Sequence, residues 1–408
     1  MSRPRLVVIA STYPAHPGDG TPAFVRDLAI AEAQEFDTTV IVPAVPGGAA
    51  REQDGPLRVR RFRFFPRRWE DLAAGAILEN LRSAPHRWLQ LPSFFAAECF
   101  ALRRAVRRSG ADVVHVHWLI PQGIAALLVA RRMPALVTTL GGDLYALRDP
   151  VSRFLIRAVV RNAAAITTMN QDMRARLIEL GADPATTVVL PMGADVDVIR
   201  PLSAAVTREP GRILFVGRLV DKKGVEVLIR ALRGLAGGYE ARVVGDGPLR
   251  AELERLAAEL PVTFVGTVGR EQLAAEYGAA AVAVFPSVRA TSGDQDGLPV
   301  AMLEAMSAGC AVVASDLPGI SEAVVDGESG LLVQAGSVDQ LRDALDRVLA
   351  EPDLRKRLGA GAASRADQFS VAEVGRRYCE LLTAVLARHD AGTGAAAGPA
   401  SVIAAAER

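Results

Sequence analysis

The sequence alternates short β-branched runs with longer segments of helical period, and this alternation constrains the fold more than any other feature. It is typical of βαβ units, in which helices cover both faces of a parallel sheet. In the first half of the chain we expect strands at Leu6–Ala10, Thr39–Val42, Val113–His117, Ala135–Thr139, Ala165–Thr168 and Val188–Leu190. The helices expected between them include Ala23–Ala33, Phe94–Arg108 and Pro150–Asn162.

The alternation breaks at Asp197–Arg212, a segment with two prolines and no clear period, and then restarts. The strands expected after the break are Arg212–Val216, Ala241–Val244, Val262–Phe264, Val282–Phe285 and Ala311–Ala314. The expected helices are Lys223–Leu235, Pro248–Glu259, Glu271–Tyr277, Val300–Ala308 and Val338–Leu349. The sequence therefore predicts an α/β protein of two doubly wound, Rossmann-like domains facing across a cleft, with ligands outside the carboxyl ends of the strands.

We place the two domains at residues 1–200 and 201–370. The amphipathic pattern from Val371 to Leu386 predicts a C-terminal helix, residues 371–388, that packs back on the N-terminal domain. The Ala/Gly-rich residues 389–408 are typical of a flexible tail.

Composition excludes several classes of protein. A chain of 408 residues is too long for one ordinary core, and a formal net charge of +1 gives no general attraction to nucleic acid. The three widely spaced cysteines, Cys99, Cys310 and Cys379, predict neither a disulfide framework nor a zinc site, and they fit a reducing cytoplasm. No apolar run approaches the roughly 18 residues of a membrane span. The short apolar run near the N-terminus predicts a buried strand rather than a signal peptide.

One segment, Arg58–Trp69 ("RVRRFRFFPRRW"), departs from this rhythm because six arginines alternate with aromatic residues. It is compatible with a strand that has one wet face. It is also compatible with a basic, aromatic-tipped patch that touches the inner face of a membrane or an anionic acceptor.

In the second half, "VGRLVDKKG" ends a strand at Gly217 and opens a helix after Lys223. Arg218 and Lys223 then lie near free N–H groups at the start of a helix, where cations are unfavourable unless they share an anion. A diphosphate would be such an anion. Taken alone, the two residues are more typical of a surface turn, and the other motifs give the anion-binding interpretation its weight.

Further along, "SGDQDGLPVAMLEAMSAGC" places Asp296 and Glu304 on either side of a loop-to-helix junction. These carboxylates fit helix capping and a solvated face, and they also fit contacts with a substrate.

Three segments of the first half end strands with polar residues or glycine. Gly18, Asp19 and Gly20 form a Pro-rich loop that can bring bare backbone close to a phosphate or a sugar. His117 shares one side of its strand with His115, and Gly142-Asp143 follows another strand end. The ordinary alternatives are a satisfied polar histidine and a turn capped by aspartate.

Taken in order, "VGRLVDKKG", "VVGDGPLR", "FVGTV", "VFPS" and "DGLPVAMLEAMSAGCAVVAS" closely resemble the retaining glycosyltransferases of family 4, which have the GT-B fold. The loop after the first strand, "DVVHVHW" and "LPMGADVDVIRP" also fit, so that the resemblance covers about Leu6 to Leu386. It implies transfer of a hexose-type sugar from a UDP-, GDP- or ADP-linked donor to a hydroxyl acceptor, with retention of configuration and no metal. The N-terminal domain would bind the acceptor and the C-terminal domain the nucleotide sugar.

The resemblance also implies roles for individual residues. Arg218 and Lys223 match the basic pair that neutralises the leaving diphosphate. Glu304 matches the acid that grips the ribose, and Asp296 matches the acid beside the donor sugar. The remaining donor-binding positions are Gly217, Val268 at the nucleobase, and the segment Gly297, Leu298, Pro299 and Val300. The backbone N–H groups of this segment, which Pro299 lacks, would contact the sugar and the phosphate.

The chain departs from the family pattern at two positions. The first acid is normally Glu and is here Asp296, one methylene shorter. A histidine common in the third N-terminal motif is replaced by Gly141, and His117 is a candidate for part of its role. The acceptor and phosphate positions would be Gly18, Asp19, Gly20, His117, Gly142 and Asp143. Two alternatives stay open. One is a nucleotide-sugar 2-epimerase of the same fold, which needs additional acid/base carboxylates and histidines in the cleft. The other, which Gly141 and Asp296 motivate, is an inactive nucleotide-sugar-binding protein.

Overall fold

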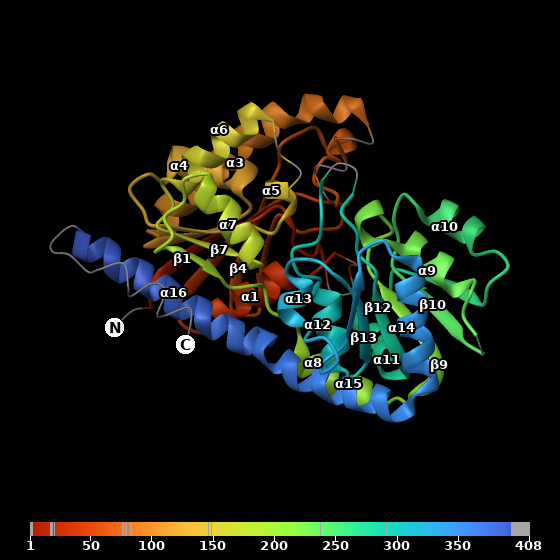
Figure 1. The fold of residues 1–408 in the computed structure, drawn as a ribbon. Coiled ribbons are helices and arrows are strands. Elements are labelled where there is room, and N and C mark those ends of the chain that lie inside the picture. The colour runs from red at the N-terminus through yellow and green to blue at the C-terminus, as the bar shows by residue number, and fades with distance from the viewer. Residues whose placement is uncertain are drawn as a thin grey trace. The chain divides into compact units, whose positions relative to one another are not determined.

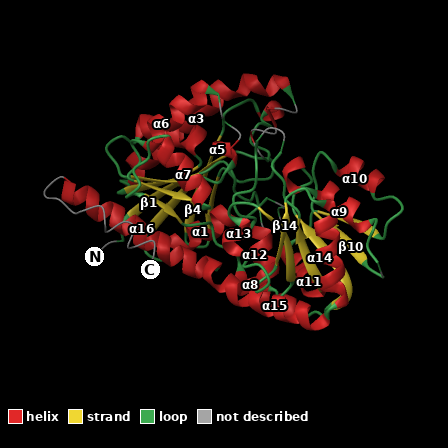
Figure 2. Ribbon diagram, in the orientation of Figure 1, coloured by secondary structure: helices red, strands yellow, loops and turns green. Residues whose placement is uncertain are grey.

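The computed structural model describes residues 3–16, 19, 21–75, 77, 80–81, 84–145, 147, 149–236, 238–290 and 293–392. The chain divides into two compact units. Unit 1 comprises Met1–Met192 and Val374–Arg408, and unit 2 comprises Gly193–Glu373. Figure 2 shows that strands form the centre of each unit and helices lie on their faces.

Unit 1 contains an eight-stranded sheet with the order β3-β4-β2-β1-β5-β6-β7-β8. All neighbouring strands pair in parallel except the β3–β4 hairpin, which is antiparallel. The strands are β1 (Arg5–Ile9), β2 (Asp37–Pro43), β3 (Arg51–Asp54), β4 (Leu57–Phe62), β5 (Val113–His117), β6 (Ala135–Thr138), β7 (Ala165–Thr168) and β8 (Thr187–Val189). The chain order reverses between β1 and β5, so the loops that follow these two strands flank the point where such sheets bind ligands.

Two helices of unit 1, α6 and α7, start at side-chain caps that the sequence provides. Asp149 accepts hydrogen bonds from Val151 N and Ser152 N at the start of α6, and Asn170 accepts one from Met173 N at the start of α7. The described helices are α1 (Phe24–Glu32), η1 (Arg67–Trp69), η2 (Pro85–Gln90), α3 (Leu91–Ser109), η3 (Leu119–Gly123), α4 (Ile124–Val129), α5 (Gly142–Tyr145), α6 (Pro150–Val160) and α7 (Gln171–Glu179).

Unit 2 contains a six-stranded parallel sheet with the order β11-β10-β9-β12-β13-β14 (Figure 1). Its strands are β9 (Glu209–Val216), β10 (Glu240–Val244), β11 (Val262–Gly266), β12 (Ala280–Phe285), β13 (Ala311–Asp316) and β14 (Leu331–Gln334). The chain order reverses between β9 and β12, which defines the switch point of this sheet.

Two buried clusters hold the helices of unit 2 on its sheet. One cluster includes Leu214, Val312 and Met306, and the other includes Ile213, Val313 and Ile229. Because neighbouring strand residues belong to different clusters, both faces of the sheet are covered. The helices are α8 (Val196–Ala204), η4 (Asp221–Lys223), α9 (Val225–Leu232), α10 (Arg250–Leu256), α11 (Arg270–Ala279), α12 (Val300–Ser307), α13 (Ile320–Ala323), α14 (Val338–Ala350), α15 (Pro352–Ala366) and η5 (Asp367–Phe369).

The last helix, α16 (Val371–Gly392), begins in unit 2 and belongs to unit 1 from Val374 onward. Its Tyr378 is fully buried, and the hydroxyl donates a hydrogen bond to Leu190 O at 2.9 Å and lies within hydrogen-bond distance, 3.1 Å, of Thr167 Oγ1. No helix in the described part of the chain is long and apolar enough to cross a membrane.

The predicted α/β class with two doubly wound, Rossmann-like sheets is confirmed, whereas the cleft between them stays a prediction. One local prediction is wrong: Asp197–Arg212 is not an irregular linker, because it contains most of α8 and the start of β9. Pro201 lies inside α8 and obscured its helical period. The division of the chain falls at Met192/Gly193 rather than at the predicted 200/201. Of the predicted tail, 389–392 are helical and the remainder lies outside the described residues.

Candidate active site

Two loops meet at the switch point of unit 2. One, residues 217–224, follows β9, and the other, residues 286–299, follows β12. Gly224 joins them because its φ is +63° and a Cβ placed there would lie 1.9 Å from Pro286 O. The N–H of Val288 also donates to Lys222 O at 2.8 Å. Only glycine permits this approach, which fixes the lysines relative to the second loop.

A group of ionic side chains occupies this junction. Lys223 Nζ lies 2.9 Å from Asp296 Oδ2, which also accepts a hydrogen bond from Ser287 Oγ at 2.7 Å. Lys222 Nζ lies 3.1 Å from Asp294 Oδ2 and 3.9 Å from Asp296 Oδ1. The two lysines of the first loop therefore form ion pairs with two aspartates of the second loop.

Asp296 is ionised although it is buried. Its side chain is only 8% exposed. Burial raises the pKa of this carboxyl, but the charges of Lys223 and Lys222 and the hydrogen bonds from Lys223 and Ser287 together bring the pKa below its usual value. The aspartate thus positions Lys223, and it does so as a charged group at neutral pH.

Arg218 lies in the same loop as Lys223 and is exposed. The backbone before it is anchored, because Gly217 N donates to Val244 O at 3.0 Å. A Cβ on Gly245 would lie 2.0 Å from Gly217 O, so the loop after β10 packs directly against this backbone. The arginine therefore extends from a fixed turn at the carboxyl end of β9.

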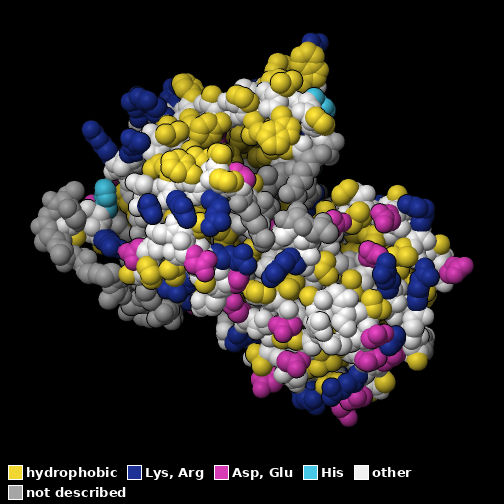
Figure 3. All heavy atoms as spheres, turned by 45° about the horizontal axis from the view of Figure 1, so that its top comes forward, with side chains coloured by type: hydrophobic (Ala, Val, Ile, Leu, Met, Phe, Trp, Pro, Cys, Tyr) yellow, Lys and Arg dark blue, Asp and Glu magenta, His cyan; other side chains and the backbone are white. Residues whose placement is uncertain are grey.

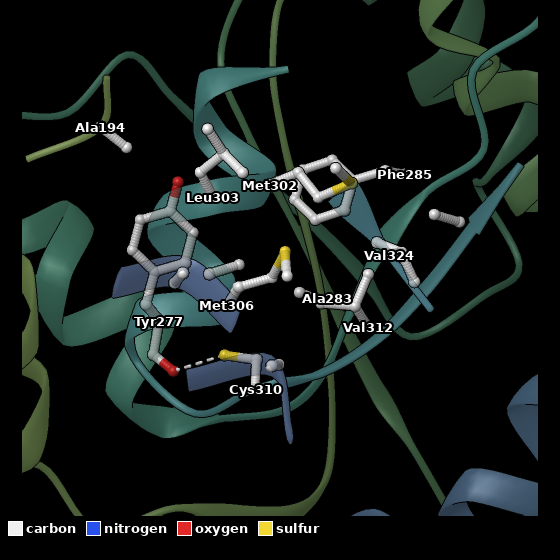
Figure 4. Packing of buried hydrophobic residues seen from close by; sticks show 14 of the residues in the cluster. Ala194, Tyr277, Ala283, Phe285, Met302, Leu303, Met306, Cys310, Val312 and Val324 are labelled. Atoms are coloured by element: carbon white, nitrogen blue, oxygen red, sulfur yellow. Dashed lines mark hydrogen bonds between the residues drawn. The ribbon is translucent and has the colours of Figure 1, made fainter. Parts of the chain in front are cut away.

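Glu304 lies on α12, which follows the second loop. Its Oε2 accepts a hydrogen bond from the hydroxyl of Tyr277 at 2.9 Å. Figure 4 shows Tyr277 beside Leu303 and Met306 of α12, and its backbone carbonyl accepts a hydrogen bond from Cys310 Sγ. Burial, and then the negative charge of Glu304, raise the pKa of Tyr277 far above its usual value, so the tyrosine remains a donor. The carboxylate of Glu304 is oriented by a fully buried side chain.

The other predicted donor-binding residues surround these groups. Pro299 is the N-cap residue of α12, and no side chain caps this helix start. Gly297 is buried, and Leu298, Val300 and Val268 pack on the cluster that contains Met306. Val268 follows β11, two strands away from β9.

In unit 1, the predicted acceptor loop follows β1. Gly18 and Gly20 lie outside the described residues. The carboxylate of Asp19 accepts hydrogen bonds from Ala15 N at 2.6 Å, and from Thr21 N and Thr21 Oγ1, both at 3.1 Å. Partial burial raises the pKa of Asp19, but these hydrogen bonds bring it below its usual value. The aspartate ties its own loop together.

His117 is fully buried at the end of β5, and neither ring nitrogen has a partner among the described residues. Its ring lies 4.3 Å from that of His115. His115 is also buried, with Nδ1 2.6 Å from Glu32 Oε1 and Nε2 2.8 Å from Thr138 Oγ1. Burial lowers the pKa of both histidines, which are therefore neutral at physiological pH.

Asp143 links two strand ends of unit 1. It is buried and accepts hydrogen bonds from Leu119 N at 2.6 Å and Thr139 Oγ1 at 2.7 Å. The first bond holds the turn after Trp118, whose φ is +76°. Gly142 is half-buried beside it and has open space where a Cβ would stand. Asp143 thus joins the loop after β5, next to the switch point of this sheet, to the residue that follows β6.

Two family models together match most of the chain. The family "Glycosyl transferases group 1" matches residues 203–365, and "Glycosyl transferase 4-like domain" matches residues 19–193. A D-inositol 3-phosphate glycosyltransferase of Frankia alni is 31% identical over 73% of this chain and 82% of its own length. The chain belongs to the family 4 glycosyltransferases. The enzyme is also 30% identical to a GDP-mannose-dependent alpha-(1-6)-phosphatidylinositol monomannoside mannosyltransferase of Mycolicibacterium smegmatis, over 69% of this chain and 79% of the relative.

Solved structures show the fold of the glycosyltransferase to be GT-B. Sucrose-phosphate synthase from Thermosynechococcus elongatus matches 94% of this chain and 100% of its own with a TM-score of 0.75 and 22% identity. Anabaena HepE in complex with UDP and glucose matches 93% of this chain and 100% of its own with a TM-score of 0.67 and 19% identity.

The structure of the glycosyltransferase adds four residues to the predicted group around Lys223, Asp296 and Glu304. Lys222 and Ser287 were visible in the motifs "VDKKG" and "VFPS", and Asp294 lies two positions before Asp296. Tyr277 had no signal, because a tyrosine at the end of an amphipathic helix is usually a core residue.

Proposed function

We propose that the enzyme transfers a hexose-type sugar from a nucleoside-diphosphate sugar to a hydroxyl acceptor, with retention of configuration. The observation that carries this proposal is the position of Lys223, held by Asp296 at the switch point of unit 2, with Arg218 in the same loop. Cations at this point suit a diphosphate, and a preorganised cation stabilises the charge that develops on the leaving phosphate.

The proposed chemistry is a front-face displacement. The bond between the anomeric carbon and the phosphate oxygen breaks, and the acceptor oxygen bonds to the same carbon on the same face. The acceptor proton goes to the leaving phosphate, and Arg218 and Lys223 balance the remaining negative charge. Glu304, oriented by Tyr277, would accept hydrogen bonds from the ribose hydroxyls. The N–H groups at the start of α12 would face the sugar and the phosphate.

We further propose that the acceptor binds to unit 1, beside the loops that follow β1 and β5. Asp19 accepts hydrogen bonds from Ala15 and Thr21 after β1, and Asp143 accepts one from Leu119 N in the loop after β5. Two relatives are named for inositol phosphate and phosphatidylinositol mannoside acceptors. Inositol-bearing acceptors are therefore the first to test, followed by other lipid-linked sugars, polysaccharide ends and small metabolites.

The proposal is tested by incubating the enzyme with UDP-, GDP- and ADP-sugars and these acceptors. Acceptor-dependent release of nucleotide, with an α-linked product from an α-linked donor by NMR, supports it. Interconversion of sugars would indicate an epimerase, and binding without turnover an inactive protein. Arg218→Ala and Lys223→Ala should each lower kcat by roughly 10²-fold or more, whereas the control Lys356→Ala, on the exposed side of α15, should not.

A peripheral contact with the inner face of the membrane through Arg58–Trp69 also stays a proposal, with a narrower basis. Three of its arginines form ion pairs with carboxylates: Arg58 with Asp37, Arg61 with Glu52 and Arg63 with Glu70. Phe62 and Phe64 are buried against Phe94 of α3. The part that is left for a membrane is Arg67–Trp69, where Arg68 stacks 3.9 Å from the centre of the half-exposed Trp69 ring.

A further inference from the structure

An arginine-lined groove lies on unit 1, between the β3–β4 hairpin and α3. Its volume is about 290 Å³, and its lining includes Arg51, Arg60, Arg104 and Arg108 together with Phe100. None of these four arginine side chains has a carboxylate or other hydrogen-bond partner among the described residues. The groove is distinct from the switch point, because it runs along α3 rather than across the carboxyl ends of the strands.

The arginines form two like-charged pairs that face one another. Arg51 and Arg60 are directly opposite in the β3–β4 register, where like charges are destabilising. Arg60 shares its strand face with Phe62, which packs on Phe94 of α3. Arg104 and Arg108 are four residues apart on α3, which is also unfavourable for like charges.

The proximity of the four charges also affects the pKa of Arg108. Desolvation, and then the charges of Arg104, Arg60 and Arg51, lower the pKa of Arg108. A helix C-terminus favours one cation at Arg108, but it does not explain four cations around one groove. An anion shared among them would remove the repulsion.

The surface around the groove is apolar as well as basic. Helices α3, α4 and α6 carry six arginines and one acid, Glu98, which is fully buried. Figure 3 shows hydrophobic side chains gathered over this part of unit 1, with Lys and Arg side chains near their margin. The large hydrophobic side chains exposed on η1, η2, α3, α4 and α6 are Trp69, Trp88, Leu89, Phe100, Leu128, Val151 and Phe154. The elements are neighbours, since α3 contacts both η2 and α4, and α4 contacts α6.

We infer that this face docks on an anionic lipid bilayer, with lipid phosphates in the arginine groove and the exposed apolar side chains in the headgroup–acyl boundary. Arginine binds phosphate oxygens with its planar donors. The described helices α3, α4 and α6 carry exposed apolar side chains and no exposed acid, so this surface suits a lipid bilayer better than it suits an acidic protein. The inference rests on the proposed membrane contact, and it places the main contact on α3 and the groove instead of Arg67–Trp69.

The test is co-sedimentation with vesicles of phosphatidylcholine alone and of phosphatidylcholine with phosphatidylglycerol. The wild type should bind the anionic vesicles, and salt should weaken the binding. Arg104→Gln/Arg108→Gln should weaken the partition coefficient about 25-fold, at roughly fivefold per charge. The control Arg230→Gln/Arg347→Gln removes the same charge from exposed positions of α9 and α14 and should change it little. Phe100→Ser/Phe154→Ser should weaken the binding even at low salt.

Each other outcome overturns the inference. Arg67→Gln/Arg68→Gln could lose binding while Arg104→Gln/Arg108→Gln keeps it in full. That result would support the contact through Arg67–Trp69 and would exclude a role of the groove in membrane binding. Equal loss in the unit 2 control would show a non-specific charge effect. Binding of inorganic pyrophosphate without vesicle binding would indicate a site for soluble anions, and dimers by light scattering without vesicle binding would indicate a second copy as the partner. None of these measurements requires glycosyl transfer, so failure of the transferase proposal is recorded separately.

Discussion

Replacing Lys223 by glutamine should destabilise unit 2 in a pH-dependent way. The substitution removes the nearest cation, at 2.9 Å, from a carboxylate that is only 8% exposed. Breaking a buried ion pair by removing one partner costs about 3–5 kcal/mol. Lys222 remains 3.9 Å from Asp296, and Lys223 is itself 19% exposed. We therefore expect a loss of about 2–3 kcal/mol at neutral pH, below the usual range for a fully buried pair.

The sign of the pH dependence follows from the pKa of Asp296. In the wild type this pKa is lowered, so the stabilisation is complete above the ordinary carboxyl pKa and is lost as the pH falls through the folded-state value. In Lys223→Gln burial outweighs the remaining interactions and the pKa rises. The two proteins should therefore differ most at neutral pH, and the difference should become smaller as the pH falls toward 4 and Asp296 becomes protonated in the variant.

The assay is native-state hydrogen exchange of peptides from β12 and α12, which reports the opening free energy of unit 2. Wild type, Lys223→Gln and the exposed control Lys356→Gln are compared at the same pH, so intrinsic exchange rates cancel. Equal protection in wild type and Lys223→Gln, or a difference that is the same near pH 4 and pH 7, would refute the role assigned to this ion pair.

Three further predictions concern single contacts. Tyr277→Phe removes the hydroxyl that orients Glu304 and should weaken nucleoside-diphosphate binding by about 0.5–1.5 kcal/mol; unchanged affinity by calorimetry would exclude this role. Gly224→Ala would place a methyl group 1.9 Å from Pro286 O at a φ of +63°, so kcat and the melting temperature should both fall, and normal values for both would contradict the account of the loop junction. Burial raises the pKa of Glu98 to about 8 from 4.5, so stability should decrease as the pH rises across this interval, by up to about 1.4 kcal/mol per pH unit. Glu98→Gln should remove this decrease, because the glutamine side chain does not titrate and its amide oxygen can still accept from Gln122. Melting curves of the variant with the same pH slope as those of the wild type would show the assignment to be wrong.

Much of the architecture was predictable because strand and helix periods are local. Val113–His117 and Ala165–Thr168 match the structure residue for residue. The β3–β4 hairpin was not predicted, since Arg51–Asp54 is polar throughout and pairs only along one edge. Segments whose character comes from tertiary contacts are the ones that local patterns miss.

The candidate site divides in the same way. Lys223 and Asp296 were predicted from motifs, and the loop junction at Gly224 brings them together. The aspartate's function as a partner of Lys223 could not be predicted, because it depends on a contact between residues 73 positions apart in the chain. The role of Tyr277 could not be predicted for the same reason, because the hydrogen bond from its hydroxyl to Glu304 joins two different helices, α11 and α12.

The central claim is that Lys223, with Arg218, binds the diphosphate of the donor. The sequence contains three lysines, Lys222, Lys223 and Lys356, so reductive ¹³C-methylation labels few positions and substitution can assign each signal. In a titration with UDP, GDP and ADP followed by NMR, the account predicts that the signals of Lys223 and its neighbour Lys222 shift with the nucleotide that binds, while that of Lys356 on α15 stays in place. A nucleotide that binds by calorimetry and leaves both signals of the pair unchanged would contradict the claim.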